Sequence, residues 1–405
     1  MTFEQKINNY IELVLTVGIN IHEGDNVYLK INTHLDWFAT SLVKRAYELG
    51  AREVITTFRH DELERVRYDH ASDEVLTNVY PEQVERDKLF AEQNFKLISV
   101  ASPNPYAMEG VDSKKIQMEM AAYLEKCYRM KKNTTSNLNT WCVIACANQK
   151  WADYATDGDL DKLWEMIFTA TRANQDNPTE LWNEHIERLS QIAETLNNSN
   201  FDYLHFENSL GTDLKVGLVK EHIWTAAGDM NSRLNQKFVP NIPTEEVFTM
   251  PDKYSVNGRV VASKPLNNNG QIIDDFWIEF KDGAVEQYEA QVGKSALEAI
   301  ITTDEGSKYL GEVALVSKTS PINQMNQLFY NTLFDENSSC HLALGNAYPT
   351  NIVGGVEMDN EVKEQNHVNV SKEHVDFMFG TEDMKITGYT ASSSQVIFED
   401  GDFKL

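Results

Sequence analysis

Residues 26–58, NVYLKINTHLDWFATSLVKRAYELGAREVITTF, contain a strand, a helix and a second strand in close succession. Asn26 to Ile31 has an apolar residue at every second position, which is typical of a strand. Asp36 to Leu49 has the spacing of an amphipathic helix and ends at Gly50. Glu53 to Phe58 has the pattern of a second strand. This order predicts parallel strands joined by a helix that covers their sheet.

The same alternation of helices and strands continues to about residue 200. We expect helices at Phe3–Val17 and Lys114–Met130, and strands at Phe95–Ser102 and Trp141–Ala147. No glycine-rich phosphate loop follows any of these strands, so a nucleotide site is not indicated. Two long helices come next, at about 159–174 and 179–196, and the polar segment Asn197–Asn200 ends the pattern. We place the boundary between two domains there.

Residues 201–405 consist mainly of short strands, with helices expected at about 293–303 and 322–334. The segment Lys281-Asp-Gly283 separates two of the strands and predicts a hairpin, and hairpin signals recur at Gly388 and at Asp400-Gly401. The predicted fold is therefore an α/β domain with a parallel sheet and covering helices at 1–200. An α+β domain rich in antiparallel sheet is expected at 201–405.

The net charge of the chain argues against two classes of binding partner. Its 405 residues include 62 acidic and 36 basic residues, a net charge of −26, which disfavours nucleic acid and anionic membrane surfaces. We find no signal peptide, and no apolar run long enough for a membrane helix. The four cysteines form no CxxC pair, and we interpret Cys142 and Cys146 as buried apolar residues. These features predict a cytoplasmic protein.

Four segments of the second domain place carboxylates or histidines in apolar, strand-like surroundings. The residues concerned are Glu245, Glu246, Glu312, Glu336, His341, His374 and Asp376. His374 and Asp376 lie two residues apart on a predicted strand, so both point to one face. Glu245 and Glu246 are neighbours and point to opposite faces. Glu312 opens an apolar run, where a buried carboxylate is costly unless it is paired or bound to a metal.

Each segment alone also has a simpler explanation. Glu246 fits an exposed acidic turn, Glu312 the edge of a strand, and His341 a core histidine. His374 and Asp376 fit a surface ion pair. Because only one of Glu245 and Glu246 can face the site, the set contains three Glu, two His and one Asp. These offer nitrogen and oxygen donors without cysteine, a mixture that suits zinc, manganese or cobalt. One carboxylate that bridges two ions leaves about three ligands for each, plus water, as in an open catalytic site.

Four motifs resemble a known family in the same order along the chain. They are NIPTEEVFT at 241–249, GEVALV at 311–316, HLALGNAY at 341–348 and HVDFMFG at 374–380. These segments resemble the signatures of the aminopeptidase T / aminopeptidase S (PepS) family of bacterial metallo-aminopeptidases. The resemblance covers the whole chain and is strongest between about residues 220 and 395. It implies an α/β N-terminal domain, a C-terminal catalytic domain, a pair of divalent metal ions and a homodimer.

The resemblance also implies the site residues. The metal ligands fall on Glu246, Glu312, Glu336, His341, His374 and Asp376. Glu312 would bridge the two ions, and Tyr348 matches the family's active-site tyrosine. The expected reaction is the release of N-terminal amino acids from peptides by a water held between two zinc, cobalt or manganese ions. The alternatives are a dinuclear hydrolase of another amide or ester bond, and a non-catalytic protein that binds metal or peptide.

Overall fold

The chain forms two compact units in a computed structural model that describes residues 1–104, 107–108, 110–268 and 271–405. The first unit contains Met1–Trp182 and Gly228–Ile242, and the second contains Asn183–Ala227 and Pro243–Leu405. The expected boundary at residue 200 coincides with the end of a long helix, α10 (Pro178–Ser199). In the structure the division lies within this helix, and a later segment returns to the first unit.

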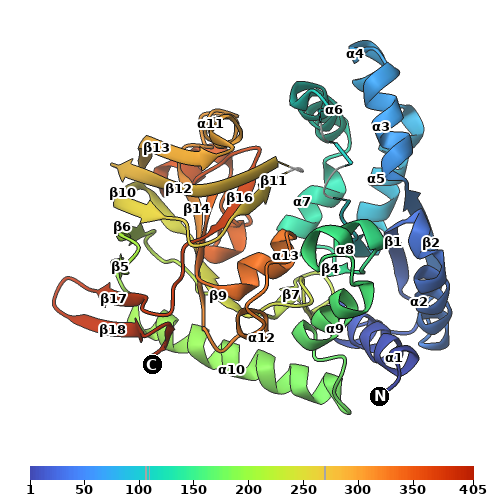
Figure 1. Cartoon of the computed structure of the whole chain (residues 1–405), viewed down its shortest axis with the longest axis horizontal. Coiled ribbons are helices and arrows are strands. Elements are labelled where there is room, and N and C mark those ends of the chain that lie inside the picture. Colours follow the sequence, from blue (N-terminus) through green and yellow to red (C-terminus); the bar gives the residue numbers. More distant parts are fainter. Residues whose placement is uncertain (105–106, 109, 269–270) are drawn as a thin grey trace. The chain divides into compact units, whose positions relative to one another are not determined.

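The first unit has the predicted parallel sheet (Figure 1). Its strand order is β2-β1-β3-β4. The strands are β1 (Asn26–Asn32), β2 (Glu53–Arg59), β3 (Lys96–Ala101) and β4 (Trp141–Ala145). All three pairings are parallel. The sheet therefore confirms the fold class expected from the opening strand, helix and strand.

Helices connect and cover these strands. They are α1 (Phe3–Leu13), α2 (Asp36–Glu48), α3 (Asp61–His70), α4 (Asp73–Leu76), α5 (Pro81–Glu92), α6 (Ser113–Lys126), α7 (Arg129–Thr135), α8 (Gln149–Ala155) and α9 (Leu160–Ala170). A hairpin of β7 (Asp229–Asn231) and β8 (Gln236–Phe238) completes the unit. Cys142 and Cys146 are free and fully buried, as expected.

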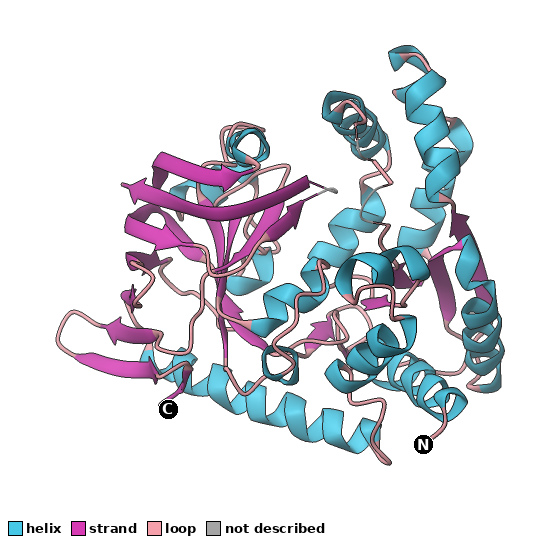
Figure 2. Ribbon diagram, viewed as in Figure 1, coloured by secondary structure: helices cyan, strands magenta, loops and turns pink. Residues whose placement is uncertain are grey.

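The second unit is rich in antiparallel sheet, also as predicted (Figure 2). Its larger sheet has the order β11-β12-β10-β6-β5-β17-β18-β19, with β13 paired to β12. The strands are β5 (Tyr203–Glu207), β6 (Asp213–Leu218), β10 (Pro251–Val261), β11 (Leu266–Asn268), β12 (Gln271–Lys281), β13 (Ala284–Val292), β17 (Lys385–Tyr389), β18 (Ser394–Glu399) and β19 (Asp402–Phe403). Helix α11 (Lys294–Ile301) packs against β12 and β13.

A smaller antiparallel sheet carries the four motifs. Its order is β16-β15-β14-β9, made of β9 (Glu246–Thr249), β14 (Leu310–Val316), β15 (His341–Gly345) and β16 (His374–Met378). Every residue of β14 and β15 is buried. One hydrophobic cluster includes Phe206 and Val216 of the larger sheet together with Val313, Leu342 and Phe377 of the smaller sheet. One face of the smaller sheet therefore belongs to the core of the unit, and the opposite face is left for other uses.

The prediction of one helix at about 322–334 is wrong. The structure has two short helices instead, α12 (Pro321–Gln324) and α13 (Thr332–Asp335). Asn326 and Tyr330 between them adopt left-handed φ angles of 47° and 54°, which a continuous right-handed helix does not tolerate. A further short helix, α14 (Asn360–Gln365), lies between β15 and β16.

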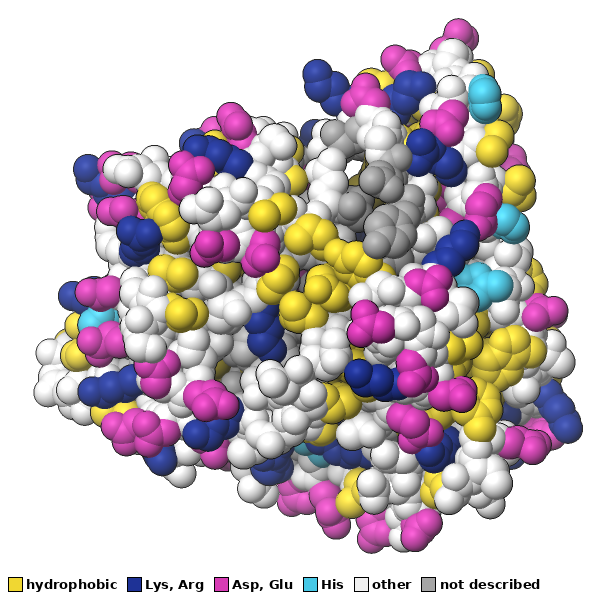
Figure 3. All heavy atoms as spheres, in the orientation of Figure 1, with side chains coloured by type: hydrophobic (Ala, Val, Ile, Leu, Met, Phe, Trp, Pro, Cys, Tyr) yellow, Lys and Arg dark blue, Asp and Glu magenta, His cyan; other side chains and the backbone are white. Residues whose placement is uncertain are grey.

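Among the described residues, no helix combines the length and the apolar character that crossing a membrane requires. On the face shown in Figure 3, Asp and Glu side chains are interspersed with Lys and Arg side chains. The acidic side chains on this face are thus not gathered in one patch.

Candidate metal centre

Strand alternation places the predicted ligands on one face of the smaller sheet. Successive side chains of a strand point to opposite faces. The residues that alternate with the predicted ligands are Val247, Val313, Leu342 and Phe377, and all four belong to the hydrophobic core. Glu246, Glu312, His341, His374 and Asp376 consequently share the face turned away from this core.

The register brings these side chains level with one another. Glu312 pairs with Ala343, which in turn pairs with Asp376 on the next strand. His341 pairs with Ala314, and His374 pairs with Gly345. The positions between the polar side chains are therefore occupied by alanine or glycine, which leaves space above the sheet for the polar groups.

Gly345 is required where it stands. Its φ is +105°, and a Cβ there would lie 2.3 Å from the carbonyl oxygen of Glu373. Any larger residue would push away the start of β16, the strand that carries His374. The close approach of β15 and β16 at the centre thus depends on a residue without a side chain.

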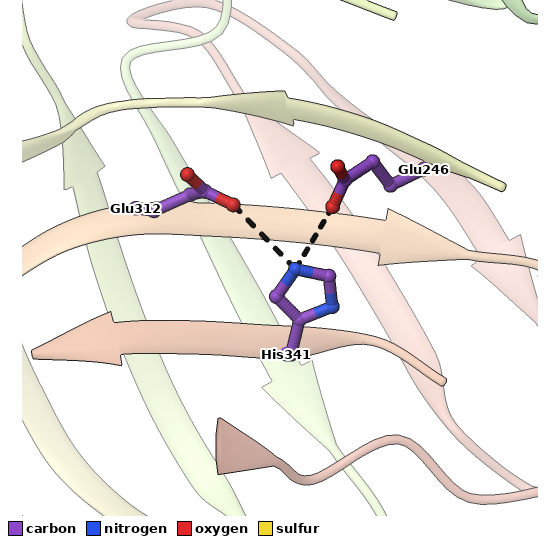
Figure 4. Close-up of side chains that lie close together, drawn as sticks. All are labelled: Glu246, Glu312 and His341. Carbon is purple, nitrogen blue, oxygen red and sulfur yellow. Dashed lines mark ion pairs between the residues drawn. The ribbon is translucent and has the colours of Figure 1, made fainter. Parts of the chain in front are cut away.

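The five side chains form two groups that share Glu312. In the first group, His341 Nε2 lies 2.9 Å from Glu246 Oε2 and 3.5 Å from Glu312 Oε1 (Figure 4). In the second group, His374 Nε2 lies 3.6 Å from Glu312 Oε2 and 3.3 Å from Asp376 Oδ1. Within each group the potential ligand atoms lie within 4.8 Å of one another. The two oxygens of the Glu312 carboxylate therefore face different histidines.

The orientation of both imidazoles is fixed by backbone carbonyls. His341 Nδ1 lies 3.2 Å from the carbonyl oxygen of Ser339, and His374 Nδ1 lies 2.7 Å from that of Asn346. A carbonyl oxygen only accepts, so each Nδ1 donates its proton. Each Nε2 is then directed at the carboxylates, and this is how metal-binding histidines are commonly oriented.

The donor atoms fit a divalent cation. With neutral imidazoles, Glu246 Oε2 and Asp376 Oδ1 are buried and have no hydrogen-bond donor. A carboxylate oxygen close to a nitrogen lone pair is repulsive unless a proton or a metal ion lies between them. Two donors about 2.1 Å from one ion and about 90–110° apart are separated by about 3.0–3.4 Å. The four nitrogen–oxygen separations, 2.9, 3.3, 3.5 and 3.6 Å, lie in this range or close to it.

The pKa values of these side chains in the absence of a metal ion also indicate a site that favours positive charge. Burial raises the pKa of Glu312 to about 7, against the opposing effect of His341 and His374. Burial also opposes the charge on His374, yet the negative charge of Asp376 raises its pKa to about 10. For His341, the hydrogen bonds with Glu246 and Glu312 outweigh burial, and its pKa lies well above the usual value. Without a metal ion, these three side chains, which could bind a cation, therefore bind protons more tightly than usual.

Glu336 lies beside the two groups without belonging to either. It opens the 3-10 turn Glu336–Ser338, immediately before β15. Its pKa is raised well above the usual value by burial, and then by the charges of Asp376 and Glu246. The structure therefore brings the sixth predicted ligand into the electrostatic environment of the other five.

Tyr348 lies next to the second group. Its ring packs edge-on against the His374 ring, with centroids 5.0 Å apart, and it also contacts Phe248 at 6.2 Å. Burial and the surrounding carboxylates, Glu312 first among them, raise its pKa well above 10. The phenol therefore keeps its proton and is able to donate it in a hydrogen bond.

Sequence reasoning did not single out the residues that support the start of β9. Glu245 is buried on the other side from Glu246, and its Oε2 lies 3.6 Å from Nε2 of His185 on α10. The Glu245 backbone N–H donates to Oδ1 of the buried Asn337, at 2.7 Å. Asn337 in turn donates to the Leu333 carbonyl. No periodicity marks His185 or Asn337, because their roles depend on contacts distant in the sequence.

Fold and donor set together define a metalloenzyme. Residues 3–403 match the family described as thermophilic metalloprotease (M29), and the chain belongs to this family. It is 40% identical to aminopeptidase AmpS of Bacillus subtilis (strain 168), over 99% of both chains. It is 37% identical to aminopeptidase PepS of Streptococcus thermophilus, over 100% of this chain and 99% of that one.

A solved structure supports the same relationship. Wild-type AmpT from Thermus thermophilus matches with a TM-score of 0.92 and 30% identity, over 100% of both chains. The resemblance to the aminopeptidase T / aminopeptidase S family is therefore confirmed, as is the enzyme class of metallo-aminopeptidase. A metalloprotease family implies a divalent metal ion, and the two groups of acidic and histidine side chains suit one.

Proposed function

We propose that the chain removes N-terminal amino acids from peptides with two divalent ions held on the smaller sheet. Glu246 and His341 would hold one ion, His374 and Asp376 the other, and Glu312 both, with Glu336 as a sixth ligand. The observation that carries this proposal is the position of Glu312, whose Oε1 and Oε2 lie 3.5 and 3.6 Å from two different histidines. When bound, such ions would lower the pKa of a bound water and would act as a Lewis acid on the substrate carbonyl.

The two halves of the centre differ in exposure, which suggests the side of substrate entry. The His341 side chain is 1% exposed, whereas those of His374 and Asp376 are 20% and 12% exposed. The first group is thus closed to solvent, as structural metal sites are. The second group is open to solvent, as catalytic metal sites are. We propose that the peptide reaches the centre past His374 and Asp376.

Tyr348 would act on the substrate itself. Its ring lies against His374, on the open side. Its hydroxyl makes no hydrogen bond within the described part of the chain, and its raised pKa keeps the proton in place. We propose that this hydroxyl donates to the carbonyl oxygen as negative charge develops there. Preorganised donors of this kind commonly contribute about 10²–10³ to kcat.

The excess of carboxylates favours a substrate with a free amine. Glu246, Glu312, Glu336 and Asp376 face only two histidines, so two bound divalent ions neutralise the pocket without leaving a large positive charge. A positively charged N-terminus is then tolerated close to the scissile bond. Glu245 is not assigned to this role, because its side chain lies against His185.

Hydrolysis of leucine-p-nitroanilide tests the proposal. The chelated chain should be inactive, and zinc, manganese or cobalt should restore cleavage. An N-acetylated substrate should remain intact, because it has no free amine. Cleavage of the acetylated substrate would indicate a broader amidase, and no cleavage with any of the three metals would refute the proposal. Native metal, homodimer and cytoplasmic location remain predictions; light scattering of the purified chain tests the dimer.

A further inference from the structure

A second polar hollow lies in the same unit, outside the metal centre. Its volume is about 290 Å³. Its walls come from the ends of several strands and include Ser263, Lys264, Lys318, Ser339 and Glu382. A volume of about 30 Å³ for each water molecule gives room for about ten waters, or for a small molecule the size of an amino acid. The metalloprotease activity does not account for this hollow.

Lys264 brings a positive charge to the hollow without a carboxylate partner. Its Nζ donates to Ser338 Oγ at 2.6 Å, and no ion pair within 4.0 Å joins it to a described carboxylate. Burial lowers its pKa, and the charge of Asp335 offsets this only in part. The Asp335 oxygens accept from the backbone N–H groups of Phe329 and Asn331, at 2.8 and 2.9 Å. Two ammonium protons of Lys264 are thus left for a ligand.

Lys318 and Ser263 line the same hollow and are also unsatisfied. The backbone of Lys318 is fixed, because its N–H donates to the Gly401 carbonyl at 2.8 Å and its own carbonyl accepts from Gln324. Its ammonium pairs with no described residue. Ser263 Oγ is buried and has no hydrogen-bond partner in the part of the chain that is described. Two lysines without an ion pair to a described carboxylate therefore line one hollow, in a chain whose net charge is −26.

The rim of the hollow carries the opposite charge. Glu382 is exposed, and its carboxylate forms no ion pair with a described residue. An inorganic anion would leave Glu382 unpaired and would be repelled by it. A zwitterion would satisfy both sets of groups, with its carboxylate near the two lysines and its ammonium near Glu382.

We propose that this hollow binds a free α-amino acid. The ligand carboxylate would accept from Lys264 and Lys318, and its ammonium would face Glu382. Free amino acids are the products of the reaction proposed above, so a supply of the ligand rests on that function, although binding itself does not. The site is separate from the metal ligands and would not require an ion.

The position of the hollow links it to the metal centre. Ser339 lines the hollow, and its carbonyl accepts from His341 Nδ1 at 3.2 Å. Val316 also lines the hollow and pairs with Glu246 across β14 and β9. An amino acid bound in the hollow would therefore contact residues that adjoin two ligands of the closed group, His341 and Glu246. Leucine bound in the hollow should therefore change the kcat of leucine-p-nitroanilide hydrolysis. Leucine that competes with substrate at the metal centre would raise the apparent KM and leave kcat unchanged.

Equilibrium dialysis of labelled L-leucine against the full chain tests the proposal. The metal-loaded enzyme should bind leucine at two sites, and the chelated enzyme should keep the one in the hollow. Replacing Lys264 by Met, or Lys318 by Gln, should weaken this remaining site by about tenfold or more, because each removes a charge-assisted hydrogen bond. The matched control is Lys281→Gln, an exposed lysine paired with Glu286, which should bind leucine like the wild type.

Three other probes identify the ligand chemistry. Leucinamide lacks the carboxylate and should not bind. N-acetyl-leucine lacks the ammonium and should bind to the wild type about tenfold more weakly than leucine does. Glu382→Gln should bind the two ligands equally well. Inorganic phosphate should compete poorly. The proposal is overturned if the chelated chain binds no leucine, if both lysine variants bind normally, or if phosphate binds as tightly as leucine. Because the Lys318 ammonium pairs with no described residue, its variant should fold and remains informative even if Lys264→Met fails to fold.

Discussion

Replacing Glu312 by Gln should stabilise the metal-free chain while it destroys activity. Glu312 is 6% exposed and lies between two histidines, with Asp376 and Glu246 nearby. Burial raises the pKa of its carboxyl from 4.5 to about 7. A raised carboxyl pKa means that the folded chain holds the proton more tightly than the unfolded chain. The ionised form of Glu312 therefore destabilises the fold, and glutamine resembles the protonated form.

The size of this effect depends on pH in a defined way. Below about pH 4.5 the carboxyl is protonated in both states, so its charge costs nothing. The cost grows between pH 4.5 and 7 and is complete above 7. For pKa values of 4.5 and about 7, linkage gives about 1 kcal/mol at pH 5 and about 3 kcal/mol at pH 8. Glu312→Gln should raise the free energy of unfolding by these amounts when no metal is present.

Urea denaturation with a chelator present, followed by tryptophan fluorescence at pH 5 and pH 8, measures the difference. Glu305→Gln makes the same charge change at a side chain that is 82% exposed, and should shift the free energy of unfolding by less than about 0.5 kcal/mol. With zinc added, the wild type should gain stability and the Glu312 variant much less. A metal-free variant that is less stable than the wild type at pH 8 would refute the reasoning. Full activity of the variant would remove Glu312 from the mechanism.

Three further predictions concern neighbouring residues. Tyr348→Phe should lower kcat by about 10²–10³ with little change in KM, measured by steady-state kinetics; an unchanged kcat would exclude Tyr348 from catalysis. Gly345→Ala should destabilise the fold by about 2 kcal/mol or more in urea denaturation, since its Cβ would lie 2.3 Å from the Glu373 carbonyl oxygen; wild-type stability would contradict this clash. Zinc binding to the metal-free chain near pH 8 should release protons, because the pKa of His374 is raised to about 10. Calorimetry in two buffers of different ionisation enthalpy measures the release, and identical heats would contradict it.

Part of the smaller sheet was predictable because β16 alternates polar and apolar residues, whereas β14 and β15 are apolar runs with one polar side chain each. His374-Val-Asp-Phe has polar and apolar residues at period two, and the structure sets Asp376 on the ligand face and Phe377 in the core. The opening strand and helix pattern likewise predicts the parallel sheet. In both cases the decisive information lies within a few consecutive residues.

The features that were missed depend on distant contacts. The helix expected at 322–334 is interrupted because Asn326 and Tyr330 adopt left-handed backbone conformations, which no apolar spacing reveals. The hairpin expected at Gly388 is present between β17 and β18. Gly388 itself, however, lies within β17 rather than in the turn, and its Cβ would be 2.7 Å from the Phe201 ring. The hydrogen bonds that orient both histidines come from backbone carbonyls, and a backbone group leaves no mark in a sequence.

In the smaller sheet, the alternation of side chains both packs the core and places the predicted metal ligands. This limits where the chain can accept insertions. A shift of a single residue between β14 and β15 would put Val313 where Glu312 belongs and turn the carboxylate into the core. Single-residue insertions inside these strands should therefore abolish folding and metal binding together. Insertions in the connections between them should be accepted, because they leave the alternation of each strand intact. Length variation among relatives should consequently be found between the four motifs, and hardly ever within them.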